Sequence, residues 1–234
     1  EFAAYGIPVY LDQTRGIVLN PFIEYLKSAL QVRVQNYSYE AVFHYLRSGL
    51  ADFSPEETDR LERYARALGI RGKKKWETLF VYPSQDMTDA VAQLEELNAL
   101  RARLVEQMEP LYGRYRKMEQ FARGLYRFIA ANRVQEKLVR FSEKFEREGD
   151  PVRAREYAQI YRLVMDLLDQ IVSLVGEEES CPEEFARILE AGFEEIQVGT
   201  IPVNVDRVMA GDMERTRLQQ VKVLFFAGVN DGYI

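Results

Sequence analysis

The chain has 234 residues, of which 47% are hydrophobic and 29% charged, and its formal net charge is −6 at pH 7. This composition excludes an intrinsically disordered chain and suffices for one large domain, or for a domain with a smaller companion. The excess of acid excludes a protein that coats nucleic acid with its whole surface, because phosphate contacts need Lys and Arg in local excess.

The first part of the chain predicts a strand and then short helices. Gly6 to Leu11 combines β-branched and aromatic residues with Gly and Pro, which favours a strand. A helix is predicted to begin at Asn20-Pro21, with proline in the tolerated first turn, and another after the N-cap Ser38. Ser54-Pro55-Glu56-Glu57 predicts the start of a third helix, because acids in the first turn suit the helix dipole.

Long apolar stripes at helical spacing follow. They run over residues 91–108, 118–145 and 157–174, and are separated by Pro110 with Gly113 and by Gly149-Asp150-Pro151. Such stripes are far more often contacts between helices than cofactor sites, so they predict long antiparallel helices and carry no functional weight.

The last part of the chain predicts strands again. Gln197 to Val205 is a candidate interrupted by Pro202, and Val221 to Gly228 is an apolar run expected to be buried on both faces. We therefore expect a mainly α fold, in which long antiparallel helices are inserted into a small α/β layer formed by the chain ends. Both ends of the sequence look cut, so we expect a piece of a longer polypeptide.

The predicted domain organisation has three parts. Residues 1–19 form the first part of the α/β subdomain, residues 20–195 the helical insertion, and residues 196–234 the return part.

No complete catalytic, metal or cofactor site can be assembled from these residues. There is no Gly-rich phosphate loop, and Asp231 lies in a turn too far beyond its strand to resemble a magnesium ligand. The single histidine, His44, has no local nucleophile or orienting partner, and it is expected to be packed or exposed at the surface. The single cysteine, Cys181, excludes an internal disulfide and lies among acids that disfavour a thiolate. A reducing compartment, most simply the cytoplasm, is expected, and no apolar run approaches the roughly 20 residues needed to cross a membrane.

The basic residues give the strongest indication of a binding site. Basic residues predominate between Arg101 and Arg140, whereas Glu177 to Glu195 is mostly acidic, so one surface is suited to an anionic partner. The candidate nucleic-acid-binding residues are Arg71, Lys73, Lys74, Lys75 and Trp76, which on a loop would hold a phosphate backbone and stack on a sugar or base. The alternative is a solvated basic turn with Trp76 folded back on the helices. A second candidate is the helical stretch with Arg114, Arg116, Lys117, Arg123 and Arg127.

Several segments resemble a known family. The passages Gly6 to Tyr10, Ile17 to Leu26 and Tyr39 to Leu50 are similar to the part of superfamily 1 helicases where a strand of the second RecA-like domain leads into an inserted helical domain, and Val221 to Gly232 is similar to the strand and turn by which that insertion returns. More specifically, Leu11 to Arg15, Ala67 to Trp76 and Gly211 to Arg217 resemble the AddB family, which supplies one of the two subunits of the bacterial AddAB ATP-dependent helicase/nuclease.

The resemblance implies a part in double-strand break repair by recombination, with an AddA-like helicase/nuclease subunit and with double- and single-stranded DNA as partners. ATP, magnesium and an iron-sulphur cluster are then expected in the parent complex, but no cofactor is expected in this chain. Where active helicases of the superfamily carry a Thr-x-His-x-x-Lys-Gly-Leu-Glu motif, this chain has Asp206 to Arg215 without the Lys-Gly pair. This departure implies a helicase-like segment without motor activity, which contributes to DNA guidance and subunit architecture. The alternative is a helical protein-interaction module with no direct DNA contact.

Overall fold

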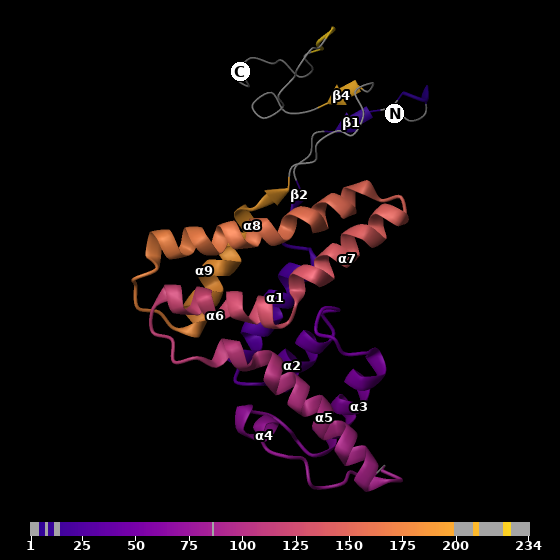
Figure 1. The fold of residues 1–234 in the computed structure, drawn as a ribbon, viewed down its shortest axis with the longest axis vertical. Helices are drawn as coiled ribbons and strands as arrows, with labels where there is room; N and C mark the ends of the chain where they lie inside the picture. Colours follow the sequence, from indigo (N-terminus) through magenta and orange to yellow (C-terminus); the bar gives the residue numbers. More distant parts are fainter. Residues whose placement is uncertain are drawn as a thin grey trace. The chain divides into compact units, whose positions relative to one another are not determined.

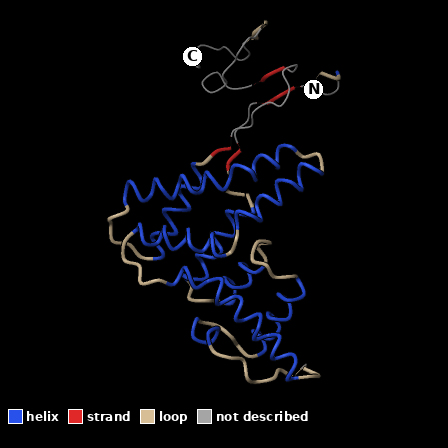
Figure 2. Tube along the Cα trace, viewed as in Figure 1, coloured by secondary structure: helices blue, strands red, loops and turns tan. Residues whose placement is uncertain are grey.

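The computed structural model describes residues 5–7, 9–11, 15–85, 87–198, 208–210 and 222–225. The chain divides into two compact units, one formed by Glu1–Thr14 with Gly199–Ile234 and the other by Arg15–Val198. The described residues are mainly helical, which confirms the predicted fold class (Figures 1 and 2). The elements are, in chain order, β1 (Val9–Leu11), β2 (Arg15–Gly16), α1 (Pro21–Val34), α2 (Tyr39–Leu46), α3 (Pro55–Ala67), α4 (Lys73–Glu77), α5 (Ala90–Met108), the 3-10 helix η2 (Glu109–Tyr112), α6 (Met118–Ala131), α7 (Val134–Arg147), α8 (Pro151–Val175), α9 (Pro182–Glu195), β3 (Gln197–Val198) and β4 (Val208–Ala210).

The short helices α1, α2 and α3 begin where the capping residues predict. The Asn20 side chain accepts a hydrogen bond from the first turn of α1, and Ser38 does the same for α2. At α3, Ser54 and Glu57 form a reciprocal capping box: Ser54 Oγ accepts from the Glu57 amide at 3.1 Å, and Glu57 Oε2 accepts from the Ser54 amide at 2.8 Å. These caps satisfy amides that have no partner within the helix, which fixes the start of each helix.

The apolar stripe over residues 118–145 is not one continuous helix. It divides into α6 and α7 at Asn132 and Arg133, and Arg133 adopts a left-handed conformation with φ of 52°. Asn132 Nδ2 donates to the carbonyl of Phe128 at 2.8 Å and to that of Gln107 at 3.2 Å. The Asn132 side chain thus satisfies carbonyls at the end of α6, and the chain turns there without Gly or Pro.

The core of the helical unit lies where its helices meet. Helix α8 crosses the unit, with α7 packed beside one part of it and α6 against another, while α1 contacts α2 and α9 (Figure 1). Aromatic rings fill the centre: Tyr25 lies 5.3 Å, centroid to centroid, from both Tyr45 and Phe128. This packing holds the end of α5, η2 and the start of α6 in place, and the candidate interface lies on these elements.

Short strands occur near both ends of the chain. In one unit, β1 pairs in parallel with β4, with Val9 opposite Val208. In the helical unit, β2 pairs antiparallel with β3, with Arg15 opposite Val198. That the chain ends form a partial RecA-like layer, and that the domains divide at residues 19/20 and 195/196, stay predictions.

The predicted buried strand over Val221 to Gly228 is wrong for the residues that are described. Residues 222–225 form no strand, and Phe225 is 88% exposed, so its side chain has no core to enter. Residues 221 and 226–228 lie outside the described part of the chain, as does most of Asp206 to Arg215.

Candidate nucleic-acid interface

The predicted basic segment is a short helix rather than a loop. Gly72, at φ of 85°, precedes α4, and its amide donates to the carbonyl of Tyr37 at 3.0 Å. A positive φ is accessible to Gly without strain, so the chain turns there directly into Lys73. An ion pair of 2.8 Å between Lys73 and Glu77, one turn apart, supports the helix.

Trp76 belongs to the core. Its side chain is 0% exposed, and its ring packs against Phe43 and Phe80 with centroids 6.2 Å and 6.0 Å away. Its carbonyl accepts from the buried Arg101 side chain at 2.9 Å. The ring is therefore folded back on the helices, the alternative left open by the sequence, and it does not offer a face to a base.

The cations around α4 differ in their availability. Lys75 Nζ donates to the carbonyl of Gly69 at 2.8 Å, and Lys73 is paired with Glu77. Arg71 and Lys74 are exposed, and neither side chain has a partner among the described residues. That these residues bind nucleic acid stays a prediction.

The second basic stretch also divides into paired and unpaired side chains. Lys117 forms an ion pair with Glu177, and this hydrogen bond raises the pKa of the Lys117 ammonium group. Arg123 pairs with Glu119 at 3.1 Å. By contrast, the side chains of Arg114, Arg116 and Arg127 are exposed and have no partner in the described part of the chain. These guanidinium groups are available for an external anion.

Tyr112 connects the two basic regions. Lys73 Nζ lies 4.8 Å from the centroid of the Tyr112 ring. The same tyrosine lines a surface hollow together with Arg114 and Arg127. The two regions, far apart in the sequence, therefore meet at one tyrosine, a proximity that sequence spacing does not predict.

The residues usually associated with catalysis do not form a site. His44 is exposed and lies 2.9 Å from Glu24 Oε1, and Cys181 is exposed as well. Among the described residues, no group of three or more His, Cys, Asp or Glu side chains could hold a metal ion. One cysteine does not fit the thiolate set of an iron-sulphur cluster. No helix in the described ranges combines the length and apolar character needed to span a membrane.

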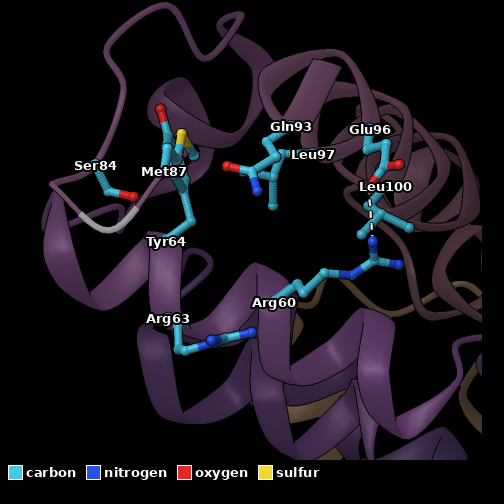
Figure 3. Close-up of a pocket in the computed structure, with 9 residues that line it drawn as sticks. All are labelled: Arg60, Arg63, Tyr64, Ser84, Met87, Gln93, Glu96, Leu97 and Leu100. Atoms are coloured by element: carbon cyan, nitrogen blue, oxygen red, sulfur yellow. Dashed lines mark hydrogen bonds and ion pairs between the residues drawn. The ribbon is translucent and has the colours of Figure 1, made fainter. Parts of the chain in front are cut away.

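A second surface surrounds a pocket between α3, α5 and the segment that joins α4 to α5. Its volume is about 150 Å³, and Figure 3 shows the Arg60–Glu96 ion pair of 2.6 Å at one side and Met87, Leu97 and Tyr64 around the hollow. Four apolar side chains in the adjoining residues 79–91 are strongly exposed: Leu79 (61%), Val81 (61%), Tyr82 (74%) and Val91 (80%).

Comparison with known proteins relates the whole chain to one group. No family model matches. Proteins named as the B component of an ATP-dependent helicase/deoxyribonuclease are similar to it: that of Lachnoclostridium phytofermentans is 39% identical over 100% of this chain and 21% of its own length. That of Clostridium novyi is 36% identical over 99% of this chain and 20% of its own, and that of Acetivibrio thermocellus is 37% identical over 99% and 21%. The chain thus spans about a fifth of these relatives.

Proposed function

We propose, from its now confirmed relationship to a segment of the AddB proteins of ATP-dependent helicase/deoxyribonucleases, that this chain is a non-catalytic, helicase-like part of such a protein. In this proposal it guides DNA and supports the architecture of an ATP-dependent helicase/exodeoxyribonuclease, together with an AddA-like partner, in double-strand break repair by recombination in the cytoplasm. ATP, magnesium and an iron-sulphur cluster are assigned to other parts of the complex.

The observation that supports DNA guidance is the proximity of unsatisfied cations on a chain that is acidic overall. Arg114 and Arg127 line the same hollow as Tyr112, and Lys73 lies over that tyrosine. Because exposed arginines bind phosphate with two parallel hydrogen bonds, this local excess of positive charge is suited to a phosphate backbone.

The test is binding of a fluorescent DNA duplex with a single-stranded tail, titrated across salt. We expect binding that weakens with salt, and a Lys73→Ala, Lys74→Ala, Lys75→Ala variant that binds more weakly with a shallower salt dependence. Each lost phosphate contact lowers the slope of log affinity against log salt by about 0.9.

A matched control removes the same charge elsewhere. Arg140, Lys144 and Arg147 are exposed on α7, which lies at the other end of the helical unit from α4 (Figure 1). Their triple alanine variant is expected to bind DNA like the original chain. Equal weakening of both variants would mean that only net charge matters, and absence of binding at low salt would refute the proposal.

The exposed apolar side chains of residues 79–91 favour the second function, a helical protein-interaction module without DNA contact. Here we expect Val81→Asp with Tyr82→Asp to weaken association with an AddA-like partner, measured by calorimetry. DNA binding that is unaffected by these changes would show that the two surfaces act separately.

A further inference from the structure

A hollow of about 620 Å³ lies beside η2 and α6, within the size range of pockets that hold small ligands. Glu109 to Tyr115 forms one side, and Tyr126, Arg127, Ala130 and Ala131 of α6 form the other. The two alanines are small, which leaves the space above this face of α6 open.

One wall of the hollow is a tyrosine ring held in place by two glycines. A Cβ atom at Gly113 would lie 2.2 Å from the Tyr115 ring, and one at Gly124 would lie 2.5 Å from it, so neither position accommodates a side chain while the ring stays there. The Tyr115 hydroxyl donates to the carbonyl of Pro110 at 2.7 Å, which fixes the far end of the ring. The wall is therefore rigid before any ligand arrives.

Another lining residue, Tyr126, is 52% exposed although it is a large aromatic residue. A ring in this position can stack with a planar ligand. The Arg114 and Arg127 side chains that line the same hollow have no partner among the described residues, and the one acid in the lining is Glu109. The hollow thus combines an available aromatic face with two cations against one carboxylate.

We propose that this hollow binds one unpaired nucleotide of single-stranded DNA, with the base stacked on Tyr126 and the flanking phosphates contacted by Arg114 and Arg127. The inference rests on the proposed function and adds a preference for strands whose bases are not paired. Every base has a π-face, so stacking tolerates any sequence, whereas bases inside a duplex are already stacked and do not reach the ring. Arginine suits the phosphates because its planar guanidinium forms two parallel hydrogen bonds.

The test compares two fluorescent probes, an oligo-dT single strand and a mixed-sequence duplex of the same length, by anisotropy. Tyr126→Ala is expected to weaken binding of the single strand by about 5- to 150-fold, the effect of losing one base–aromatic stack, and to change duplex binding by less than about twofold. Tyr126→Phe keeps the ring and is expected to bind like the original chain. Tyr82→Ala, at a tyrosine that is 74% exposed elsewhere in the same unit, is the matched control. Circular dichroism confirms that each variant is folded.

The outcomes separate this inference from the proposed function. If Tyr126→Ala leaves single-strand binding unchanged, or weakens both probes equally, the nucleotide site is refuted, while DNA guidance still stands on the lysine variant. If the original chain binds neither probe at low salt, the proposed function fails and the nucleotide site fails with it.

Discussion

Replacement of Trp76 tests whether its ring serves the core or a ligand. The side chain is 0% exposed, and removal of a buried Trp down to Ala costs about 3–5 kcal/mol. Since a whole domain is stable by only about 5–15 kcal/mol, Trp76→Ala is expected to leave the helical unit close to unfolding at room temperature.

Trp76→Phe is the informative companion. Trp76 Nε1 has no hydrogen-bond partner among the described residues, so phenylalanine loses volume but no hydrogen bond. Its cost is expected to be less than half that of Trp76→Ala. Urea unfolding followed by far-ultraviolet circular dichroism measures both, because this signal does not depend on the tryptophan.

The same residue gives an independent optical test. Trp76 is the single tryptophan of the chain, so its fluorescence reports this site alone. A buried ring predicts blue-shifted emission, little quenching by iodide and no change when DNA is added. Quenching by DNA, or an alanine variant of unchanged stability that binds DNA more weakly, would refute the assignment of the ring to the core.

Two further predictions concern stability. The Glu62 carboxylate accepts hydrogen bonds from Arg47 and Tyr39, which hold its pKa below the ordinary value. Its contribution to stability is therefore fully present above the ordinary pKa of about 4.3 and is lost as the pH falls through the lower folded value. Glu62→Gln is expected to cost about 1 kcal/mol at neutral pH and to flatten the acid side of a plot of urea midpoint against pH; an unchanged acid side would contradict this assignment. Gly124→Ala is expected to destabilise the chain by about 1–3 kcal/mol, because the new methyl group meets the Tyr115 ring. In a Tyr115→Leu background the same change is expected to be neutral or stabilising by up to about 1 kcal/mol, through better helix propensity; equal costs in both backgrounds, measured by thermal unfolding, would rule out the clash.

The helices were predictable from sequence where their determinants are local. Ser54 and Glu57 are three residues apart and form their capping box within one turn, so the start of α3 follows from adjacent residues. The break at Asn132 was not predictable, because the Asn132 side chain also bonds to the carbonyl of Gln107, a residue on another helix. No period in the apolar stripe records that contact.

The candidate interface was predictable only in its composition. The sequence indicates which stretches are basic, but the direction of the Trp76 ring depends on Phe43 and Phe80, which are distant in the chain. Likewise, Tyr115 becomes a fixed wall because Gly124, on the next helix, leaves room for its ring. A glycine inside a helix, beside a conspicuous tyrosine, was the one local sign of that close approach.

The pairing of β2 with β3 has a consequence for how the protein can be rearranged. Arg15 lies opposite Val198, and the amide of Ile17 donates to the carbonyl of Ile196, so the helical unit begins and ends at one place. An element whose two ends are adjacent is an exchangeable cassette: it can be replaced by a short turn, or its ends can be joined and reopened elsewhere, with little added loop-closure entropy. Helices within the unit can lengthen or shorten over evolution while the spacing between the two flanking strands stays the same.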